Sequence, residues 1–401
     1  MKPSGIEWIG DIPDDWEVRR GKYTLDLLMR PIRDNDEIIT CFRDGQVTRR
    51  SNRREDGFTF ADKEIGYQGI LKGDLVIHGM DGFAGAIGIS DSDGKGSPVL
   101  NVCRPKNGSD TRYINYYLRT LALQNVFIAL STGIRERSCD LRWKKIAELL
   151  FTIPPLKTQQ KIADYLDEKC GEIDATIAKQ KESIEKLKAY KQSLISETVT
   201  KGLDKSALLK PSGIKWLGEI PQNARIIRLR FLSSIQTGDK DTVNRVENGK
   251  YPFYVRSPIV ERIDTFSFDG EAILMAGDGV GAGKVFHYVN GKFDYHQRVY
   301  NIHNLKGVLG KFLYYYLREN FYKEIEQSNA KSTVDSIRLP MLLDFPIIVY
   351  PYDLQKEMVS FLDKKVAEID AIIIKKQNII QKLDAYKKSL IFECVTGKQI
   401  T

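Results

Sequence analysis

The chain repeats itself, because a twelve-residue stretch near its start returns about two hundred residues later. Residues 2–13 read KPSGIEWIGDIP and residues 210–221 read KPSGIKWLGEIP, so nine of the twelve positions are identical. Other stretches return at smaller offsets: 113–120 as 312–319, 166–177 as 362–373, and 186–202 as 382–398. We interpret this pattern as a tandem duplication of a unit of about 200 residues.

The two copies resemble each other at their ends and differ in their middles, roughly residues 30–110 and 230–310. Two similar frames therefore hold two different inserts. Residues 71–89 and 268–286 each predict a strand, a glycine-rich turn and a second strand. Residues 113–130 and 312–325 have helical spacing, so we expect the inserts to be mixed α and β.

Each copy closes with a segment of about 40 residues, near 157–199 in the first copy, whose apolar residues repeat every 3.5 positions. A seam sustained over four heptads is typical of a coiled coil, and such a helix spans about 60 Å. Both copies break the seam with polar residues at the same two steps, which favours pairing of the two helices with each other. The seam positions are Leu166, Cys170, Ile173, Ile177, Gln180, Ile184, Leu187, Lys191 and Leu194, then Leu362, Val366, Ile369, Ile373, Lys376, Ile380, Leu383, Lys387 and Leu390.

From these patterns we predict an α+β fold in which two mixed α/β globular domains are separated by two long helices. The helices are expected to form an antiparallel coiled coil with an internal pseudo-two-fold repeat. The domains would then sit at opposite ends of the coiled coil, as in a calliper.

Composition narrows the class of protein. A chain of 401 residues suits two to four domains, and neither a long uncharged apolar run nor a signal-peptide layout is present, so we expect a cytoplasmic location. The five cysteines lie far apart, which favours buried free thiols over disulfides or a zinc site. The net charge of +8 includes local clusters at 49–54 (RRSNRR) and 134–145, and focused positive charge suits phosphate binding.

The motifs of known enzymes are missing from the sequence. GDGVGAGK at 277–284 resembles a phosphate loop, but Asp278 and Val285 occupy places that need glycine and Ser or Thr, so we interpret it as a tight turn. The four histidines lack metal-ligand spacing, and no nuclease or methyltransferase motif is recognisable. A binding protein is the favoured interpretation. The alternatives are a stand-alone DNA methyltransferase or nuclease with unrecognised catalytic motifs, and a purely structural scaffold.

The repeated frame, its opening motif P-S-G-I-x-W-(I/L)-G-x-I-P and the passage IPPLKTQQKIADYLDEK resemble the specificity subunit of a type I restriction–modification enzyme. KGDLVIHGMDGFAG also resembles the strand and glycine loop of that family's target recognition domains. The second copy departs from the pattern, since Pro351 stands alone where the first copy has Pro154 and Pro155.

The resemblance implies target recognition domains at 1–152 and 207–348, each followed by a long spacer helix, at 153–206 and 349–401. It implies a chain without catalysis of its own that binds a bipartite, asymmetric sequence in double-stranded DNA. Two DNA-adenine methyltransferase (modification) subunits and restriction (translocase/nuclease) subunits would be its partners. S-adenosylmethionine, ATP and magnesium would be bound by those partners, so no cofactor, metal or catalytic residue is assigned to this chain.

The candidate DNA-contacting residues are basic or amide side chains of the inserts and their exits. Arginine suits guanine and glutamine suits adenine, but half or more of all DNA contacts go to phosphate and sugar. The candidates are Arg43, Arg49, Arg50, Arg53, Arg54, Arg135 and Arg137 in the first copy, and Lys240, Arg245, Lys250, Arg256, Lys284, Gln297, Arg298, Lys331 and Ser332 in the second. Tyr67, Tyr251 and Tyr254 are further aromatic candidates for which core packing is the favoured interpretation.

Overall fold

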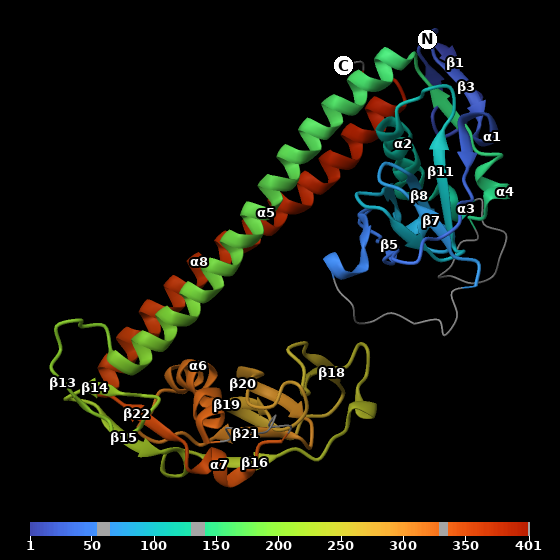
Figure 1. Cartoon of the computed structure of the whole chain (residues 1–401). Helices are drawn as coiled ribbons and strands as arrows, with labels where there is room; N and C mark the ends of the chain where they lie inside the picture. The colour runs from blue at the N-terminus through green and yellow to red at the C-terminus, as the bar shows by residue number, and fades with distance from the viewer. Residues whose placement is uncertain (54–64, 130–140, 329–335, 400–401) are drawn as a thin grey trace. The chain divides into compact units, whose positions relative to one another are not determined.

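A computed structural model of the chain describes residues 1–53, 65–129, 141–328 and 336–399 (Figure 1). The chain divides into two compact units, one formed by Met1–Gln180 with Gln377–Thr401 and the other by Lys181–Lys376. Each unit therefore contains one globular part, part of its own copy's long helix and part of the other copy's long helix.

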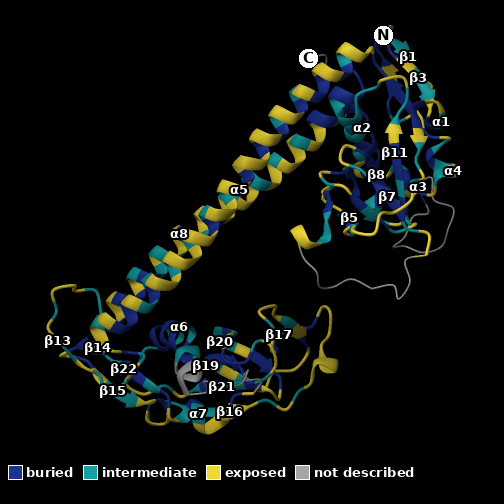
Figure 2. Ribbon diagram, in the orientation of Figure 1, coloured by how far each residue is buried: buried dark blue, intermediate teal, exposed yellow. Residues whose placement is uncertain are grey.

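The first unit has a four-stranded antiparallel sheet in the order β4-β11-β8-β9, with helix α2 packed against it. Tyr113 and Tyr117 of α2 are buried in one core cluster with Leu75 and Ile87 of the sheet. Figure 2 shows buried residues in both α2 and the strands beside it. Asp110 begins α2 by accepting hydrogen bonds from the amides of the first turn. The elements are β1 (Lys2–Pro3), β2 (Asp11–Ile12), β3 (Glu17–Arg20), α1 (Gly21–Thr24), β4 (Leu25–Leu27), β5 (Ile39–Cys41), β6 (Val47–Arg49), η1 (Arg50–Asn52), β7 (Gln68–Ile70), β8 (Leu75–His78), η2 (Gly82–Ala84), β9 (Ile87–Ile89), β10 (Gly94–Gly96), β11 (Leu100–Pro105), α2 (Thr111–Leu123), α3 (Val126–Ala129), α4 (Trp143–Ile146), β12 (Leu150–Ile153) and α5 (Leu156–Lys201).

The second unit has a six-stranded sheet in the order β16-β21-β19-β20-β17-β18, antiparallel except between β17 and β20. Helix α6 contacts β19 and β20, and Phe312 and Tyr316 of this helix are buried with Ile273 and Met275. The elements are β13 (Leu209–Pro211), β14 (Glu219–Pro221), β15 (Arg225–Arg228), η3 (Leu229–Phe231), β16 (Ser234–Thr237), η4 (Thr242–Asn244), β17 (Tyr251–Tyr254), β18 (Glu261–Ile263), β19 (Phe268–Ala276), β20 (Phe286–Tyr295), β21 (Val299–His303), α6 (Gly310–Ser328), α7 (Leu339–Leu343), β22 (Pro346–Val349) and α8 (Tyr352–Val395).

The predicted strand–turn–strand segments are present, as β8 with β9 and as β19 with β20. The predicted long helices are also present, as α5 and α8. Their seams are buried on one side, for example at Leu166 and Ile173 in α5 and at Leu362 and Ile369 in α8.

The two helices run antiparallel within each unit. In the first unit Gln399 donates to Tyr165, and further along α5 Lys387 lies 2.6 Å from Asp174. In the second unit Lys191 lies 2.5 Å from Asp370. Tyr350, just before α8, donates to the carbonyl of Thr200 near the end of α5. The polar breaks at Lys191 and Lys387 are therefore satisfied by aspartates of the opposite helix.

The two frames repeat their contacts as well as their letters. Gln159 is buried, accepts from the amide of Asp110 and donates to the carbonyl of Pro154. Gln355 is its equivalent, and it accepts from the amide of Leu309 and donates to the carbonyl of Tyr350. In both copies one glutamine side chain thus joins the residue before α2 or α6 to the segment that enters the long helix.

Four of the five cysteines, Cys41, Cys103, Cys170 and Cys394, are free and buried as predicted, and Cys139 lies outside the described residues. Burial raises the pKa of Cys41 and Cys103 to about 12, which keeps both thiols protonated at neutral pH. In the part of the chain that the structure describes, every helix is too short or too polar to cross a bilayer. The cytoplasmic location stays a prediction.

Candidate nucleic-acid interface

Each globular domain carries a glycine-rich turn at the carboxyl end of its central strand, and the chain returns to the same place from a later segment. In the first unit the amide of Leu141 donates to the carbonyl of Gly79 at 2.8 Å, just after β8. In the second unit the amide of Ile337 donates to the carbonyl of Gly277 at 2.7 Å, just after β19. The two inserts therefore each have a glycine-rich turn that makes the same backbone contact.

An aspartate in each turn binds predicted DNA-contacting arginines. Arg43 lies 2.8 Å from Asp81 in the first unit. In the second unit Arg256 lies 3.0 Å and Arg298 lies 3.6 Å from Asp278. These guanidinium groups keep much of their surface in solvent, with side chains of Arg43 and Arg298 that are 65% and 64% exposed. The carboxylates orient the arginines without removing them from contact with a ligand.

The other described candidate arginines of the first insert gather on or beside the β5–β6 hairpin and η1. Arg49 pairs with Glu37 at 2.9 Å, and Arg50 donates to the hydroxyl of Thr40. Arg53 pairs with Asp44 at 2.7 Å and lies over the ring of Phe42. A cavity of about 580 Å³ is lined by Arg43, Arg50 and Arg53 together with Tyr67, His78 and Asp81.

The surroundings of Asp44 and His78 shift the pKa of both groups and so favour one protonation state of each. Partial burial acts to raise the pKa of Asp44, but hydrogen bonds from Arg53 and the backbone outweigh it, so the pKa is lowered. Burial lowers the pKa of His78, whose Nδ1 accepts from the amides of Met80 and Asp81 in the glycine-rich turn. The turn is thus held by a neutral imidazole, and the carboxylate beside Arg53 is ionised.

The second unit brings four predicted residues to one end of its sheet. Gln297 donates to Asp241, and its amide donates to the carbonyl of Lys240. The next residue, Arg298, forms an ion pair with Asp278, and so does Arg256. Lys240, Arg256, Gln297 and Arg298 therefore lie around the second glycine-rich turn.

The buried side chain of His296 holds the backbone of the loop that carries Gln297 and Arg298. Its side chain is 3% exposed, and its Nδ1 accepts from the amide of Arg298 at 2.9 Å. Burial, with a smaller contribution from the charge of Arg256, lowers the pKa of His296. A neutral imidazole is the form that accepts this hydrogen bond.

The remaining candidates are less clustered. Arg245 lies 3.5 Å from Glu261 of β18, and the amide of Lys250 donates to Asp264. Lys284, at the end of the second turn, lies over the ring of Tyr322 at 4.1 Å from its centroid. Five candidates fall outside the described residues: Arg54, Arg135, Arg137, Lys331 and Ser332. The assignment of all the candidates to DNA contact stays a prediction.

The tyrosines are mostly packed in the protein. Tyr254 is 9% exposed and its ring contacts those of His287 and Phe293, in agreement with the core interpretation. Tyr251 is partly buried and packs against Phe266 at 5.0 Å between ring centroids.

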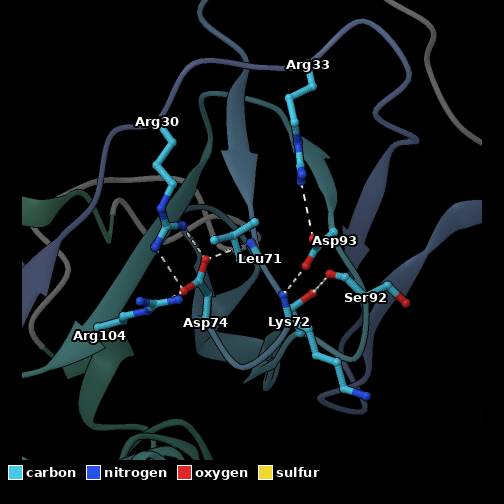
Figure 3. Close-up of polar contacts among 9 residues, drawn as sticks. Arg30, Arg33, Leu71, Lys72, Asp74, Ser92, Asp93 and Arg104 are labelled. Atoms are coloured by element: carbon cyan, nitrogen blue, oxygen red, sulfur yellow. Dashed lines mark hydrogen bonds and ion pairs between the residues drawn. The ribbon is translucent and has the colours of Figure 1, made fainter.

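A buried ion cluster in the first unit was missed by the sequence interpretation. Asp74, at the start of β8, has a fully buried side chain that accepts from Arg30 at 2.5 Å and from Arg104 at 2.8 Å (Figure 3). The amide of Leu71 also donates to this carboxylate. Asp93 nearby accepts from Arg33, but in solvent. The signal available in the sequence was only the acidic residue that opens the strand, without its partners.

Two segments of the chain match a family of known proteins. Residues 51–188 and 226–383 match the Methylase_S family, described as the type I restriction modification DNA specificity domain. The chain is 27% identical over 181 residues to the specificity subunit of the type I restriction enzyme EcoDI of Escherichia coli, covering 45% of this chain and 40% of that relative. It is 26% identical over 280 residues to the MjaVIII specificity subunit of Methanocaldococcus jannaschii, covering 64% and 63%. The matches thus span less than two thirds of these relatives.

Two solved structures share the fold. A chain from a structure addressing complex assembly and conformational transition of a type I restriction–modification system aligns with a TM-score of 0.75, 14% identity, and 97% and 100% coverage. The HsdS subunit of Thermoanaerobacter tengcongensis aligns with a TM-score of 0.53, 14% identity, and 97% and 98% coverage. At this identity the likeness shows the fold alone.

These matches confirm the predicted resemblance to type I specificity subunits and the predicted fold class, including the repeat and the paired helices. The family match confirms the predicted class of protein, a DNA specificity component of a type I system. The predicted boundaries at 152, 206 and 348 stay a prediction.

Proposed function

This chain belongs to the type I restriction–modification DNA specificity family, and from that premise we propose that it reads a two-part, asymmetric DNA sequence and scaffolds the catalytic subunits. The observation that carries the proposal is one repeated frame that holds two unlike domains. Equal domains would read two equal half-sites and so a palindrome. Unlike domains read two different half-sites.

The arginine-bordered glycine turns support a reading role for each domain. Arg43, Arg256 and Arg298 are held by a carboxylate yet remain open to solvent. Exchange of the carboxylate for a phosphate or a guanine edge conserves their charge-assisted hydrogen bonds. Since most DNA contacts go to the backbone, the majority of the candidates are expected to position the domain, and a minority to specify the sequence.

The long helices support a scaffolding role. Because the chain contains two copies of the helix, equivalent surface positions of α5 and α8 can be compared directly. Lys186, Ala189, Tyr190 and Ser193 of α5 are exposed, and the equivalent positions of α8 hold the same residue types and are also exposed. The two tyrosines are 57% and 56% exposed. These shared exposed residues fit a contact that both copies make with the same kind of partner. We infer that each copy of this surface docks one methyltransferase subunit.

The cofactors follow from this division of labour. S-adenosylmethionine, ATP and magnesium are proposed to be bound by the methyltransferase and restriction subunits. This chain would contribute the DNA address and the geometry.

The reading role is tested by domain exchange. The chain is coexpressed with its methyltransferase subunit, and methylated adenines are mapped before and after residues 30–110 are replaced by those of another family member. The expected result is a change in one half of the recognised sequence with the other half intact. A change in both halves, or in neither, contradicts the proposal. A complex that binds every duplex with equal affinity at all salt concentrations points to a scaffold without sequence reading.

The docking role is tested by single tyrosine substitutions. Tyr190→Ala and the equivalent Tyr386→Ala are each expected to lower the occupancy of one methyltransferase subunit in native mass spectrometry, and the double variant of both. Lys188→Ala is the matched control, since this residue is also exposed on α5 but its equivalent in the second copy is Asp384. Unchanged two-to-one stoichiometry in the double variant contradicts the assignment of this surface.

A further inference from the structure

Val280 at the tip of the second glycine-rich turn has its side chain wholly in solvent. Its relative exposure is 101%, the highest of any large hydrophobic residue that the structure describes. A single exposed apolar residue is common on protein surfaces and does not by itself indicate a function. Val280 differs because a rigid turn presents it and charged residues surround that turn.

The turn is held in a fixed conformation. The amide of Ala282 donates to the carbonyl of Gly279, and the amide of Gly283 donates back to the carbonyl of Ala276. Gly279 and Gly283 have φ values of 71° and 63°, which favour glycine. A Cβ on Gly281 would lie 2.7 Å from the carbonyl oxygen of Arg256, so the turn packs closely on the segment after β17. Val280 is therefore presented by a pre-organised backbone.

The glycine-rich turn of the first domain presents a different surface. Phe83 of that turn is partly buried and packs against the core of the first unit. Val280 of the second turn is instead fully exposed. A difference of this kind between the two turns is expected where two unlike inserts read different sequences.

The surroundings of Val280 match a DNA groove. Arg256 and Arg298 share the single carboxylate of Asp278, and Lys284 follows the turn. Two arginines against the one carboxylate that they share keep positive charge beside the apolar tip. Cations suit phosphates, and an apolar tip suits the carbon-rich part of a base edge, such as the thymine methyl group.

We propose that Val280 is a specificity-determining residue of the second domain, whose methyl groups contact the edge of one base pair while Arg256 and Arg298 hold the flanking backbone. This inference rests on the proposed reading of DNA. It adds the residue that discriminates between bases at one position of the half-site.

The test uses the complex of the full chain with its methyltransferase subunit and a duplex of about 30 base pairs carrying the mapped target sequence. A series of duplexes replaces each base pair of the second domain's half-site in turn. Val280→Ala removes two methyl-sized groups, so its affinity for the target is expected to fall about tenfold. The penalty for replacing one particular base pair is expected to shrink by the same factor, and affinity for a random duplex is expected to stay unchanged.

Phe231→Ala is the control, because Phe231 is also an exposed apolar residue of the second unit (68% exposed) but lies on η3 and not in the glycine-rich turn. It is expected to leave every affinity unchanged. A Val280→Ala variant with wild-type discrimination at every position overturns the inference, as does an equal loss on target and random duplexes. A wild-type complex that fails to distinguish target from random duplex instead overturns the proposed function.

Discussion

Replacement of Asp74 by asparagine tests how the first domain is held together. The carboxylate is fully buried and accepts from Arg30, Arg104 and the amide of Leu71. Asparagine keeps the size but removes the charge, so two guanidinium groups lose their counter-ion. Breaking a buried ion pair in this way costs about 3–5 kcal/mol. The Arg104 side chain is 51% exposed and can rehydrate, so we expect about 3 kcal/mol.

The assay is urea unfolding followed by tryptophan fluorescence. Three tryptophans, Trp8, Trp16 and Trp143, lie in the first unit, and Trp216→Phe removes the fourth, so that the signal reports the first unit alone. With a slope of about 2–3 kcal/mol per molar urea, the unfolding midpoint is expected to fall by about 1–1.5 M.

Asp93→Asn is the matched control, because Asp93 also accepts from an arginine and from a backbone amide, but in solvent. The control is expected to leave the midpoint unchanged, since exposed ion pairs contribute little. Equal midpoints for the Asp74 variant and the wild type would refute the reasoning, and so would equal losses in both variants.

Three other expectations concern the helices, the frame and the second domain. Lys191→Glu faces Asp370 with a like charge and is expected to lower the free energy of unfolding by about 1 kcal/mol. Asp370→Lys in the same chain is expected to restore it, and failure of this rescue in urea titrations would argue against the pairing. Gln355→Ala leaves the amide of Leu309 without its acceptor and is expected to cost about 1–3 kcal/mol, measured by thermal unfolding against Gln192→Ala on exposed α5 surface. Burial lowers the pKa of His287 and His296 in the folded protein. Below about pH 6.5 the unfolded chain therefore binds more protons at these residues than the folded chain does. Stability of the second unit is therefore expected to fall as pH drops from 6.5 towards 5, and a flat profile in hydrogen exchange would contradict this.

The repeat and the long helices were predictable because their signals are local in the sequence. A 3.5-residue spacing of apolar residues is visible without any knowledge of the partner, and α5 and α8 begin and end close to the predicted positions. The matched polar breaks at Lys191 and Lys387 indicated that the helices pair with each other. The aspartates that complete those breaks were not predicted, because Asp370 lies 179 residues from Lys191.

The basic candidates were located by composition, but their grouping was decided by the tertiary structure. Arg256, Gln297 and Arg298 come together because β17 and β20 end, and β21 begins, beside the second glycine-rich turn. The sequence also gave no indication that Asp278 binds two of the cations.

The sequence by itself determined the duplicated architecture, the helix pairing and the family, because periodicity and repetition are written along the chain. Only the tertiary structure decided that Asp74 binds arginines 44 and 30 residues away. It also decided that the first glycine-rich turn packs Phe83 against the core while the second leaves Val280 in solvent. The physical reason is that burial and ion pairing depend on which distant segments share a surface. Local spacing carries no information about that choice.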